Sequence, residues 1–268
     1  MISADGIIND LTHIRDSAPL IHNITNFVVM QPTANALLAI GASPVMAHAV
    51  GELDDILRHA KALVINIGTL DDFWLDSMRV ATKLAKQNNI PVILDPVGVG
   101  ASILRTESAL SILNANTPAV IRGNAAEIMA LAGEVVTAKG VDSQYQSVAA
   151  FSAAARLSQA YNCVVVVSGA QDWIVDRENS LELNNGVPLM TRVTGMGCTA
   201  TALIGAFCAV NSHYFSAAAH AMSIMGIAGE VAMARSEGPG SLQMHFMDAL
   251  YGLNQDTIAA KLRVKACS

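Results

Sequence analysis

The chain has 268 residues, of which 52% are hydrophobic and 14% are charged, and its formal net charge is −6. This amount of apolar material can form a large core, which excludes an intrinsically disordered protein. No basic run occurs, so neither nucleic acid nor an anionic membrane surface is an expected partner. The length allows one large domain or two small ones.

Four cysteines occur without any CxxC pair, which argues against a zinc site. The first residues are polar and lack the apolar core of a secretory signal, so we expect free thiols in the cytoplasm. Residues 193–229 contain no Asp, Glu, Lys or Arg, but Asn211, Ser212 and His213 interrupt this apolar run. The pieces are too short to span a membrane, and the run predicts two buried helices joined by a short turn.

Short runs typical of buried strands alternate with helical runs over the first 170 residues. This alternation predicts a parallel sheet with helices on both of its faces. The expected strands lie at residues 19–25, 43–49, 62–69, 91–96, 118–123 and 163–169, and helices are expected at 32–40, from 52 onward and at 71–89.

The pattern changes after the sixth strand. Residues 172–176, 180–185 and 187–193 are short runs separated by turn residues, which predicts antiparallel edge strands. Everything after them is predicted to be helical. Because no repeat, low-complexity tract or long linker interrupts the chain, we expect one α/β domain that covers residues 1–268.

Polar residues follow the predicted parallel strands, at the sheet edge where α/β proteins bind their ligands. Asp95 could hold a hard cation such as Mg²⁺ through water, or it could cap the turn before Pro96. Asn124 and Glu127 have the spacing of a helix capping box, which could also set Glu127 beside metal-bound water near a phosphate. Arg122 suits a phosphate group, with a surface ion pair as the alternative.

A glycine turn, Gly195-Met196-Gly197, precedes a cysteine at the start of a predicted helix. The turn does not match a P-loop, and its position after the last strands argues against a dinucleotide-binding turn. The remaining use of such a turn is to bind an anion with backbone N–H groups and the helix dipole.

Cys198 follows this turn, where the field of the helix is expected to favour its thiolate. The thiol could accept a proton from an attacking hydroxyl as a general base. It could also be a covalent nucleophile, although that role needs a neighbouring base, or a small buried thiol without chemistry. These interpretations stay open on the local sequence alone.

The motifs IHNITN, NIGT, DPVGVGAS, RGNAAEI, KGVDS and VTGMGC occur in this order between about Pro19 and Tyr251. Together they resemble the hydroxyethylthiazole kinase family of thiamine salvage. The resemblance implies a three-layer α/β/α ribokinase-like fold with a mostly parallel sheet and a few antiparallel edge strands. It also implies ATP- and Mg²⁺-dependent phosphorylation of the alcohol of 4-methyl-5-(2-hydroxyethyl)thiazole, by a homotrimer with active sites at its subunit interfaces.

The resemblance further implies roles for individual residues. Ser168 stands where the family commonly has threonine, and its hydroxyl can keep the same role. The implied roles are catalysis by Cys198, thiazole binding by Met46, Gly195, Asn26 and Val28, ATP binding by Arg122, Ser168, Gly197 and Asn124, and Mg²⁺ binding by Asp95 and Glu127.

Three rival functions remain on the sequence alone. The nearest is a kinase of the same fold that acts on another alcohol, such as a hydroxymethylpyrimidine or a sugar. A non-catalytic nucleotide-binding protein is the second, although Asp95, Glu127 and Cys198 argue against it. A cysteine hydrolase, which would need no ATP, is the third.

Overall fold

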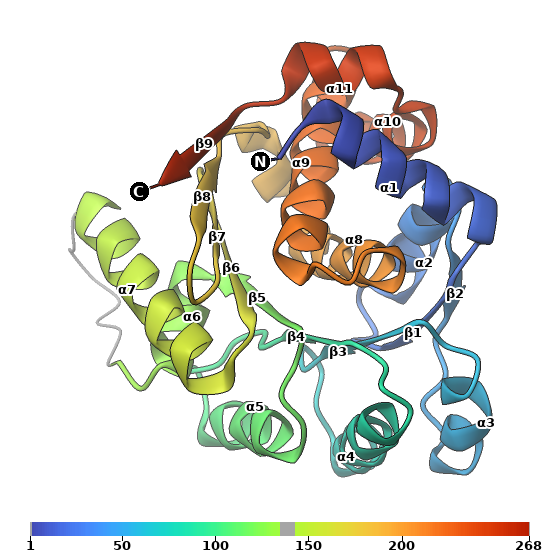
Figure 1. The fold of residues 1–268 in the computed structure, drawn as a ribbon, viewed down its shortest axis with the longest axis vertical. Coiled ribbons are helices and arrows are strands. Elements are labelled where there is room, and N and C mark those ends of the chain that lie inside the picture. Colours follow the sequence, from blue (N-terminus) through green and yellow to red (C-terminus); the bar gives the residue numbers. More distant parts are fainter. Residues whose placement is uncertain (1, 135–142, 268) are drawn as a thin grey trace.

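A mixed β-sheet runs through the described part of the chain, which is residues 2–134 and 143–267 of a computed structural model (Figure 1). Most of the KGVDS motif at 139–143 lies outside these residues. Neighbouring strands are parallel from the first to the sixth position and antiparallel beyond it, which confirms the predicted mixed sheet. In spatial order the strands are β2 (Ser43–Val45), β1 (Leu20–Ile24), β3 (Ala62–Asn66), β4 (Val92–Asp95), β5 (Val120–Asn124), β6 (Val164–Ser168), β7 (Asp172–Val175), β8 (Ser180–Leu183) and β9 (Val264–Cys267).

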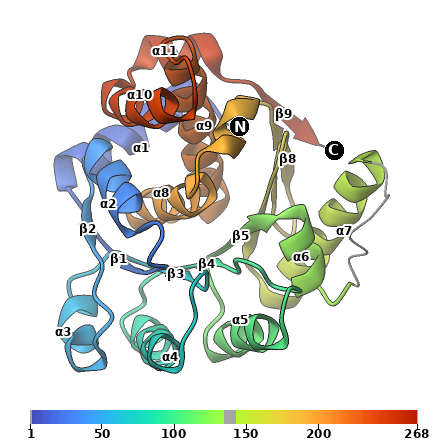
Figure 2. The same ribbon diagram turned by 180° about the vertical axis from the view of Figure 1, so that it is seen from behind.

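Helices cover both faces of this sheet, so the molecule has three layers (Figures 1 and 2). On one face lie α1 (Ala4–Ser17), α2 (Met30–Ala39), α8 (Met196–Val210), α9 (Tyr214–Met233), α10 (Pro239–Gly252) and α11 (Gln255–Lys261). On the other lie α3 (Leu53–Leu57), which follows the 3₁₀ turn η1 (Val50–Glu52), α4 (Asp72–Gln87), α5 (Ile103–Ala115), α6 (Ala125–Leu131) and α7 (Ser143–Tyr161).

The strands form two hydrophobic cores because their side chains alternate between the faces. In β6, Val164 and Val166 belong to the core under α8 and α9, whereas Val165 and Val167 belong to the core under α6 and α7. A parallel strand that is buried on both faces needs such a continuous apolar sequence. The apolar runs therefore identified these strands correctly.

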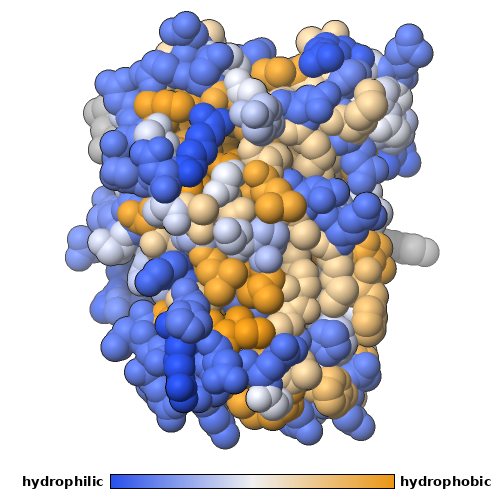
Figure 3. Space-filling model, turned by 90° about the vertical axis from the view of Figure 1, so that its right-hand side faces the viewer, coloured by the Kyte–Doolittle hydropathy of each residue, from blue (hydrophilic) through white to orange (hydrophobic). Residues whose placement is uncertain are grey.

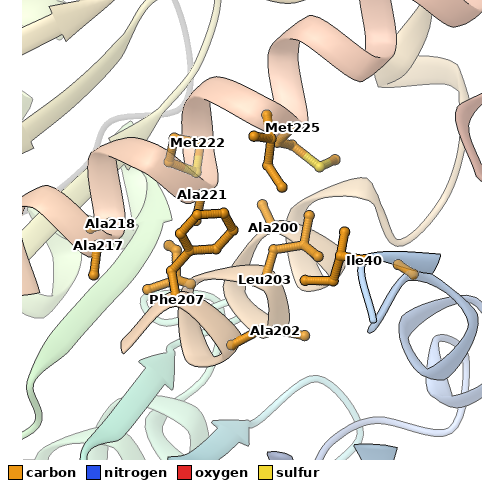
Figure 4. Packing of buried hydrophobic residues seen from close by; sticks show 14 of the residues in the cluster. Ile40, Ala200, Ala202, Leu203, Phe207, Ala217, Ala218, Ala221, Met222 and Met225 are labelled. Atoms are coloured by element: carbon orange, nitrogen blue, oxygen red, sulfur yellow. The ribbon is translucent and has the colours of Figure 1, made fainter. Parts of the chain in front are cut away.

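Helices α8 and α9 form the centre of one layer, as the uninterrupted apolar run predicts. Leu203 and Phe207 of α8 lie against Ala221, Met222 and Met225 of α9 (Figure 4). No helix in the described ranges 2–134 and 143–267 is long and apolar enough to cross a membrane.

Two sequence predictions about the antiparallel edge are wrong. Residues 187–193 do not form a strand; instead, Pro188–Arg192 form the 3₁₀ helix η2, where Pro188 has no N–H to donate to a neighbouring strand. The edge of β8 is paired with β9 from the chain end, a segment predicted to be helical. An edge strand depends on its partner more than on its own pattern.

The predicted strand at 43–49 is also too long, because β2 ends at Val45. Beyond that point the chain leaves the sheet, and the carbonyl of Ala47 bonds with His22 Nε2 at 2.8 Å. The side chain of His22 therefore ties the loop after β2 to strand β1.

The order in which the chain adds strands to the sheet reverses between the parallel strands β1 and β3. β1 connects through α2 on one face to β2, whereas β3 connects through α4 on the other face to β4. The loops after β1 and β3 therefore diverge, and such a switch point leaves a crevice at the carboxyl ends of the strands. The candidate site lies at this edge.

Candidate functional site

A chain of buried polar side chains crosses this switch point. Asn26, just after β1, donates through Nδ2 to Asn66 Oδ1 at 2.8 Å. Asn66, the last residue of β3, donates through its own Nδ2 to Asp95 Oδ2 at 2.9 Å. Asp95 ends β4. Three residues at the ends of neighbouring parallel strands are thus joined into one network, as the polar residues that follow the strands predict.

Cys198 closes this network from the helix layer. It lies in the first turn of α8, and Asn26 Nδ2 is 3.5 Å from its Sγ. The expectation that the helix start favours the thiolate is wrong in its net effect, because burial raises the pKa of Cys198 and the nearby Asp95 carboxylate raises it further. Hydrogen bonds from Asn66 and Asn26 and the charge of Arg122 act in the opposite direction.

The turn before Cys198 requires glycine at its first position. Gly195 has a φ of +83°, and a Cβ there would come within 2.7 Å of Val29 Cγ1. This conformation starts α8 without a side-chain cap. The N–H groups of the first helical turn therefore have no capping side chain, which is the condition for anion binding at a helix start.

Arg122 joins this turn to the sheet. Its Nη2 donates to Ser168 Oγ at the end of β6, and its Nη1 lies 3.8 Å from Asp95 Oδ2. Gly197 lies directly beside the same guanidinium. Arg122, Ser168, Gly197 and Asp95 thus meet, and only 11% of the Arg122 side chain is exposed, so Arg122 is not a surface ion pair.

A cavity of about 620 Å³ opens beside this cluster. A volume of this size suits a small-molecule ligand. Arg122, Ser168, Gly195 and Gly197 line it, whereas Asp95, Cys198 and Asn124 lie outside its lining. Its apolar wall includes Met222 and Met225 of α9, two of the residues in Figure 4.

Asp172 also lines this cavity and was not identified from the sequence. It begins β7 and accepts a hydrogen bond from the Gly169 N–H at 2.9 Å. Burial raises the pKa of Asp172 to about 6, although this hydrogen bond and the charge of Arg122 lower it. The sequence signal, an acid at the start of a short edge strand, is too common to indicate a site.

Asp95 has one free oxygen. It is fully buried, its Oδ2 accepts hydrogen bonds from Asn66 and from Thr201 Oγ1, and its Oδ1 has no partner among the described residues. Burial raises the pKa of Asp95 to about 6. An unpartnered carboxylate oxygen of this kind fits a cation or a cation-bound water.

In contrast to Asp95, Glu127 has a hydrogen bond at both of its carboxylate oxygens. Its two oxygens accept the N–H groups of Gly98 and Asn124, each at 2.9 Å, and Asn124 Oδ1 accepts the Glu127 N–H. The predicted capping box is therefore present. Within the described ranges, no three His, Cys, Asp or Glu side chains gather to hold a metal. Mg²⁺ needs only one or two carboxylates, with water and phosphate as its other ligands.

The residues implied for thiazole binding are less closely grouped. Val28 donates its N–H to Asn26 Oδ1 at 3.2 Å, and its side chain is 60% exposed. Met46 directly follows β2, so β1 and β3 separate it from Asp95 at the end of β4. The sequence did not predict the aromatic cluster in this region, in which the ring centroids of Trp74 and Phe27 are 4.6 Å apart.

Two members of the polar network had no role predicted from the sequence. Asn66 ends a buried strand, which is the signal that identified Asp95. Thr201 lies three residues after Cys198, so both side chains point from the same face of α8. Helical spacing from Cys198 could therefore have identified Thr201.

Known proteins resemble this chain over nearly its whole length. A sequence model described as the Hydroxyethylthiazole kinase family matches residues 11–256. The hydroxyethylthiazole kinase of Syntrophus aciditrophicus is 54% identical over 94% of both chains. That of Vibrio parahaemolyticus is 51% identical over 97% of both chains.

Solved structures agree with this comparison. The hydroxyethylthiazole kinase protein from Pyrococcus horikoshii has a TM-score of 0.91 and 42% identity, with 98% of this chain and all of that chain covered. A pyridoxal kinase from Staphylococcus aureus, solved with pyridoxal, has a TM-score of 0.65 at 14% identity, with 93% of this chain and 98% of that chain covered. The second similarity shows the fold alone, and it confirms the expected ribokinase-like architecture.

Proposed function

The chain belongs to the hydroxyethylthiazole kinase family, and we propose that it transfers the γ-phosphoryl group of ATP to the primary alcohol of 4-methyl-5-(2-hydroxyethyl)thiazole. One observation carries the mechanism: Arg122 and Cys198 meet the glycine turn at the start of α8, between the cavity and the polar network. A phosphoryl group in transfer gathers negative charge on its oxygens and needs donors at such a place.

The nucleotide occupies the cavity in this proposal. Arg122 binds the phosphates as a planar donor. The Ser168 hydroxyl and the Gly197 N–H donate to the same phosphates. The apolar wall receives the less polar part of ATP. Asn124 supports the site indirectly, because it orients Glu127 through the capping box.

The acceptor alcohol approaches Cys198 from the crevice at the switch point. Met46, Val28 and Asn26 line the thiazole pocket, and Gly195 contacts the alcohol. Cys198 Sγ takes the proton of the alcohol as the alcohol oxygen attacks the γ-phosphorus, and the bond from that phosphorus to ADP breaks. Because its pKa is raised, the thiol is a stronger base once ionised, but a smaller fraction is ionised at neutral pH.

Asp95 and Glu127 would hold Mg²⁺. The free Oδ1 of Asp95 supports direct or water-mediated binding, and the engaged oxygens of Glu127 support binding through water. When bound, the ion supplies positive charge that neutralises the phosphate oxygens. The residues themselves do two things: Asp95 anchors Arg122, and Glu127 holds the backbone around Gly98.

We propose that the working form is a homotrimer whose thiazole pockets lie between subunits. Apolar residues gather in a broad band on the side of the molecule that carries the β2 edge (Figure 3). Three large exposed apolar residues belong to segments beside β2: Phe27 and Val28 follow its neighbour β1, and Leu38 lies in α2, which contacts β2. Each subunit would be one catalytic domain, and the free cysteines fit a cytoplasmic setting.

The test is ADP release with Mg²⁺-ATP, measured with and without the hydroxyethylthiazole. Hydroxymethylpyrimidine and ribose serve as alternative acceptors. Release that depends on the thiazole supports the proposal, whereas release with another alcohol keeps the kinase and replaces its substrate. Folded protein that binds ATP and turns over no acceptor contradicts it.

A further inference from the structure

Only one of the two flip orientations of the Asn66 side-chain amide satisfies all of its hydrogen bonds. Its Oδ1 accepts the Gly68 N–H at 3.0 Å and the Asn26 amide at 2.8 Å, and its Nδ2 donates to the Asp95 carboxylate. A flipped amide would set an oxygen against that carboxylate and an NH₂ group against the N–H of Gly68. The backbone at one end and the carboxylate at the other therefore orient Asn66.

Asn66 in turn helps to orient Asn26. The Asn26 Oδ1 accepts the Val28 N–H at 3.2 Å, and its Nδ2 reaches both Asn66 Oδ1 and Cys198 Sγ. Gly68 packs closely over this amide, because a Cβ on Gly68 would lie 2.6 Å from Asn26 Nδ2. The amide of Asn26 can therefore only donate to the sulfur.

We infer that Asn66 is a positioning residue for the kinase reaction: it holds Asn26 so that its Nδ2 donates a hydrogen bond to Cys198 Sγ. This inference rests on the proposed role of Cys198 as the base. A donor aimed at the sulfur stabilises the ionised form, which is the form that accepts the proton of the alcohol. Asn66 acts across the switch point through Asn26, in addition to its own interaction with the sulfur.

A double-mutant cycle tests this link. We expect Asn66→Ala to lower kcat roughly tenfold, as loss of an orienting partner does, with little change in the KM for ATP. In the Cys198→Ala background the same change should lower the residual kcat less than about twofold, because the group through which it acts is gone. A loss of equal size in both backgrounds would overturn the inference.

Thr201→Val tests whether Asn66 acts through Asn26 or through Asp95, the two side chains with which it forms hydrogen bonds. Thr201 Oγ1 donates to the same oxygen, Asp95 Oδ2, at 2.7 Å, but it makes no hydrogen bond with Asn26. The decrease in kcat caused by Thr201→Val should therefore be the same in the Cys198→Ala background. If Thr201→Val and Asn66→Ala behave alike in both backgrounds, Asn66 acts through Asp95 and the inference is wrong.

Asn23→Ala controls for the loss of a buried amide. Asn23 lies in β1 and is fully buried, and among the described residues its side chain donates only to the Ile21 carbonyl, at 2.9 Å. Its loss should lower the melting temperature without the drop in kcat. A matching drop in kcat for Asn23→Ala would show that any buried polar change here impairs catalysis, which would overturn the specific role of Asn66.

Alkylation of Cys198 by iodoacetamide tests the same link without activity. The rate at one fixed pH, read by mass spectrometry of the Cys198 peptide, should fall several-fold in Asn66→Ala, because the thiolate is the reacting form. An unchanged rate in folded protein would overturn the inference. If the wild-type protein shows no thiazole-dependent ADP release, the proposed function is contradicted. The alkylation rates still test whether Asn66 acts on Cys198, because they do not depend on turnover.

The isosteric variant Asn26→Asp serves if Asn66→Ala does not fold. It replaces the donor at the sulfur with a carboxylate oxygen and places negative charge beside it. Alkylation of Cys198 should then slow by more than in any Asn66 variant. A rate equal to that of the wild type would show that the donor has no influence on the sulfur, and the inference would fail.

Discussion

Gly197 lies directly against the guanidinium of Arg122: a Cβ atom on Gly197 would come within 2.5 Å of Arg122 Nη1. The backbone at the start of α8 therefore approaches the tip of the Arg122 side chain as closely as a glycine allows. Any side chain on Gly197 must displace the group that we assign to the ATP phosphates.

We expect Gly197→Ala to raise the KM for ATP about tenfold, because a displaced Arg122 loses charge-assisted hydrogen bonds to the phosphates, each worth about 1.5–3 kcal/mol. The KM for the thiazole should change less than about twofold on the same reasoning. Steady-state ADP release with each substrate varied in turn measures both values. Gly240→Ala is a matched control, because Gly240 is also the second residue of a helix and has open space at its Cβ.

Cys198→Ala should lower kcat by about 10²–10⁴, the usual contribution of a general base, with little change in either KM. Cys198→Asp should keep more activity than the alanine variant, because a carboxylate can also accept the proton. Rapid-quench measurement of the first turnover separates the chemical step from product release. Full kcat in Cys198→Ala would show that the thiol serves only in packing.

Asp172 should make the protein less stable as the pH rises. The pKa of this carboxyl is raised from 3.8 to about 6 in the folded protein, so the folded state holds a proton that the unfolded chain has already lost. Stability therefore falls from about pH 4 to about pH 6. Solvent reaches part of the side chain, so we expect an effect of about 1–2 kcal/mol.

Asp172→Asn should remove this part of the pH dependence. Urea unfolding at pH 4.5 and pH 7.5 measures the difference in the free energy of unfolding, and the difference should shrink relative to wild type. Asp16→Asn is the control, because Asp16 is exposed. If the free energy of unfolding changes by the same amount between these two pH values in wild type and in Asp172→Asn, the raised pKa of Asp172 is contradicted.

Gly205→Ala should destabilise the fold. Gly205 lets α8 pack tightly on the sheet, since a Cβ there would lie 2.7 Å from Val64 Cγ2. Overpacking at such a contact costs about 1–3 kcal/mol, and chemical denaturation measures it. The same change at Gly240, which has free space, should leave the free energy of unfolding unchanged or slightly higher.

Val28→Glu tests the assembly. If the exposed apolar residues near the β2 edge form the trimer interface, a buried charge there should lower the molar mass measured by light scattering and weaken thiazole turnover. Leu104→Glu places the same charge on α5, at a residue that is also about half exposed. A trimer that survives Val28→Glu but not Leu104→Glu would move the interface to the other side of the molecule.

The sequence alone identified the parallel strands and the sheet edge that carries the candidate site, because these depend on local and repetitive signals. A strand buried on both faces must be a continuous apolar run, and a glycine turn before a helix has few physical uses. Asp95, Arg122, Ser168 and Cys198 can therefore all be named from the sequence, and the fold groups them around the start of α8.

Only the tertiary structure decided how these residues interact. Whether residues 187–193 or the chain end pairs with β8 depends on which segment reaches that edge, and a short strand does not encode its partner. The raised pKa of Cys198 depends on burial and on a carboxylate more than 100 positions away in the chain. The links from Asp95 through Asn66 and Asn26 to the sulfur likewise depend on the strand order, which sets β1, β3 and β4 side by side. It brings together side chains that no local pattern relates.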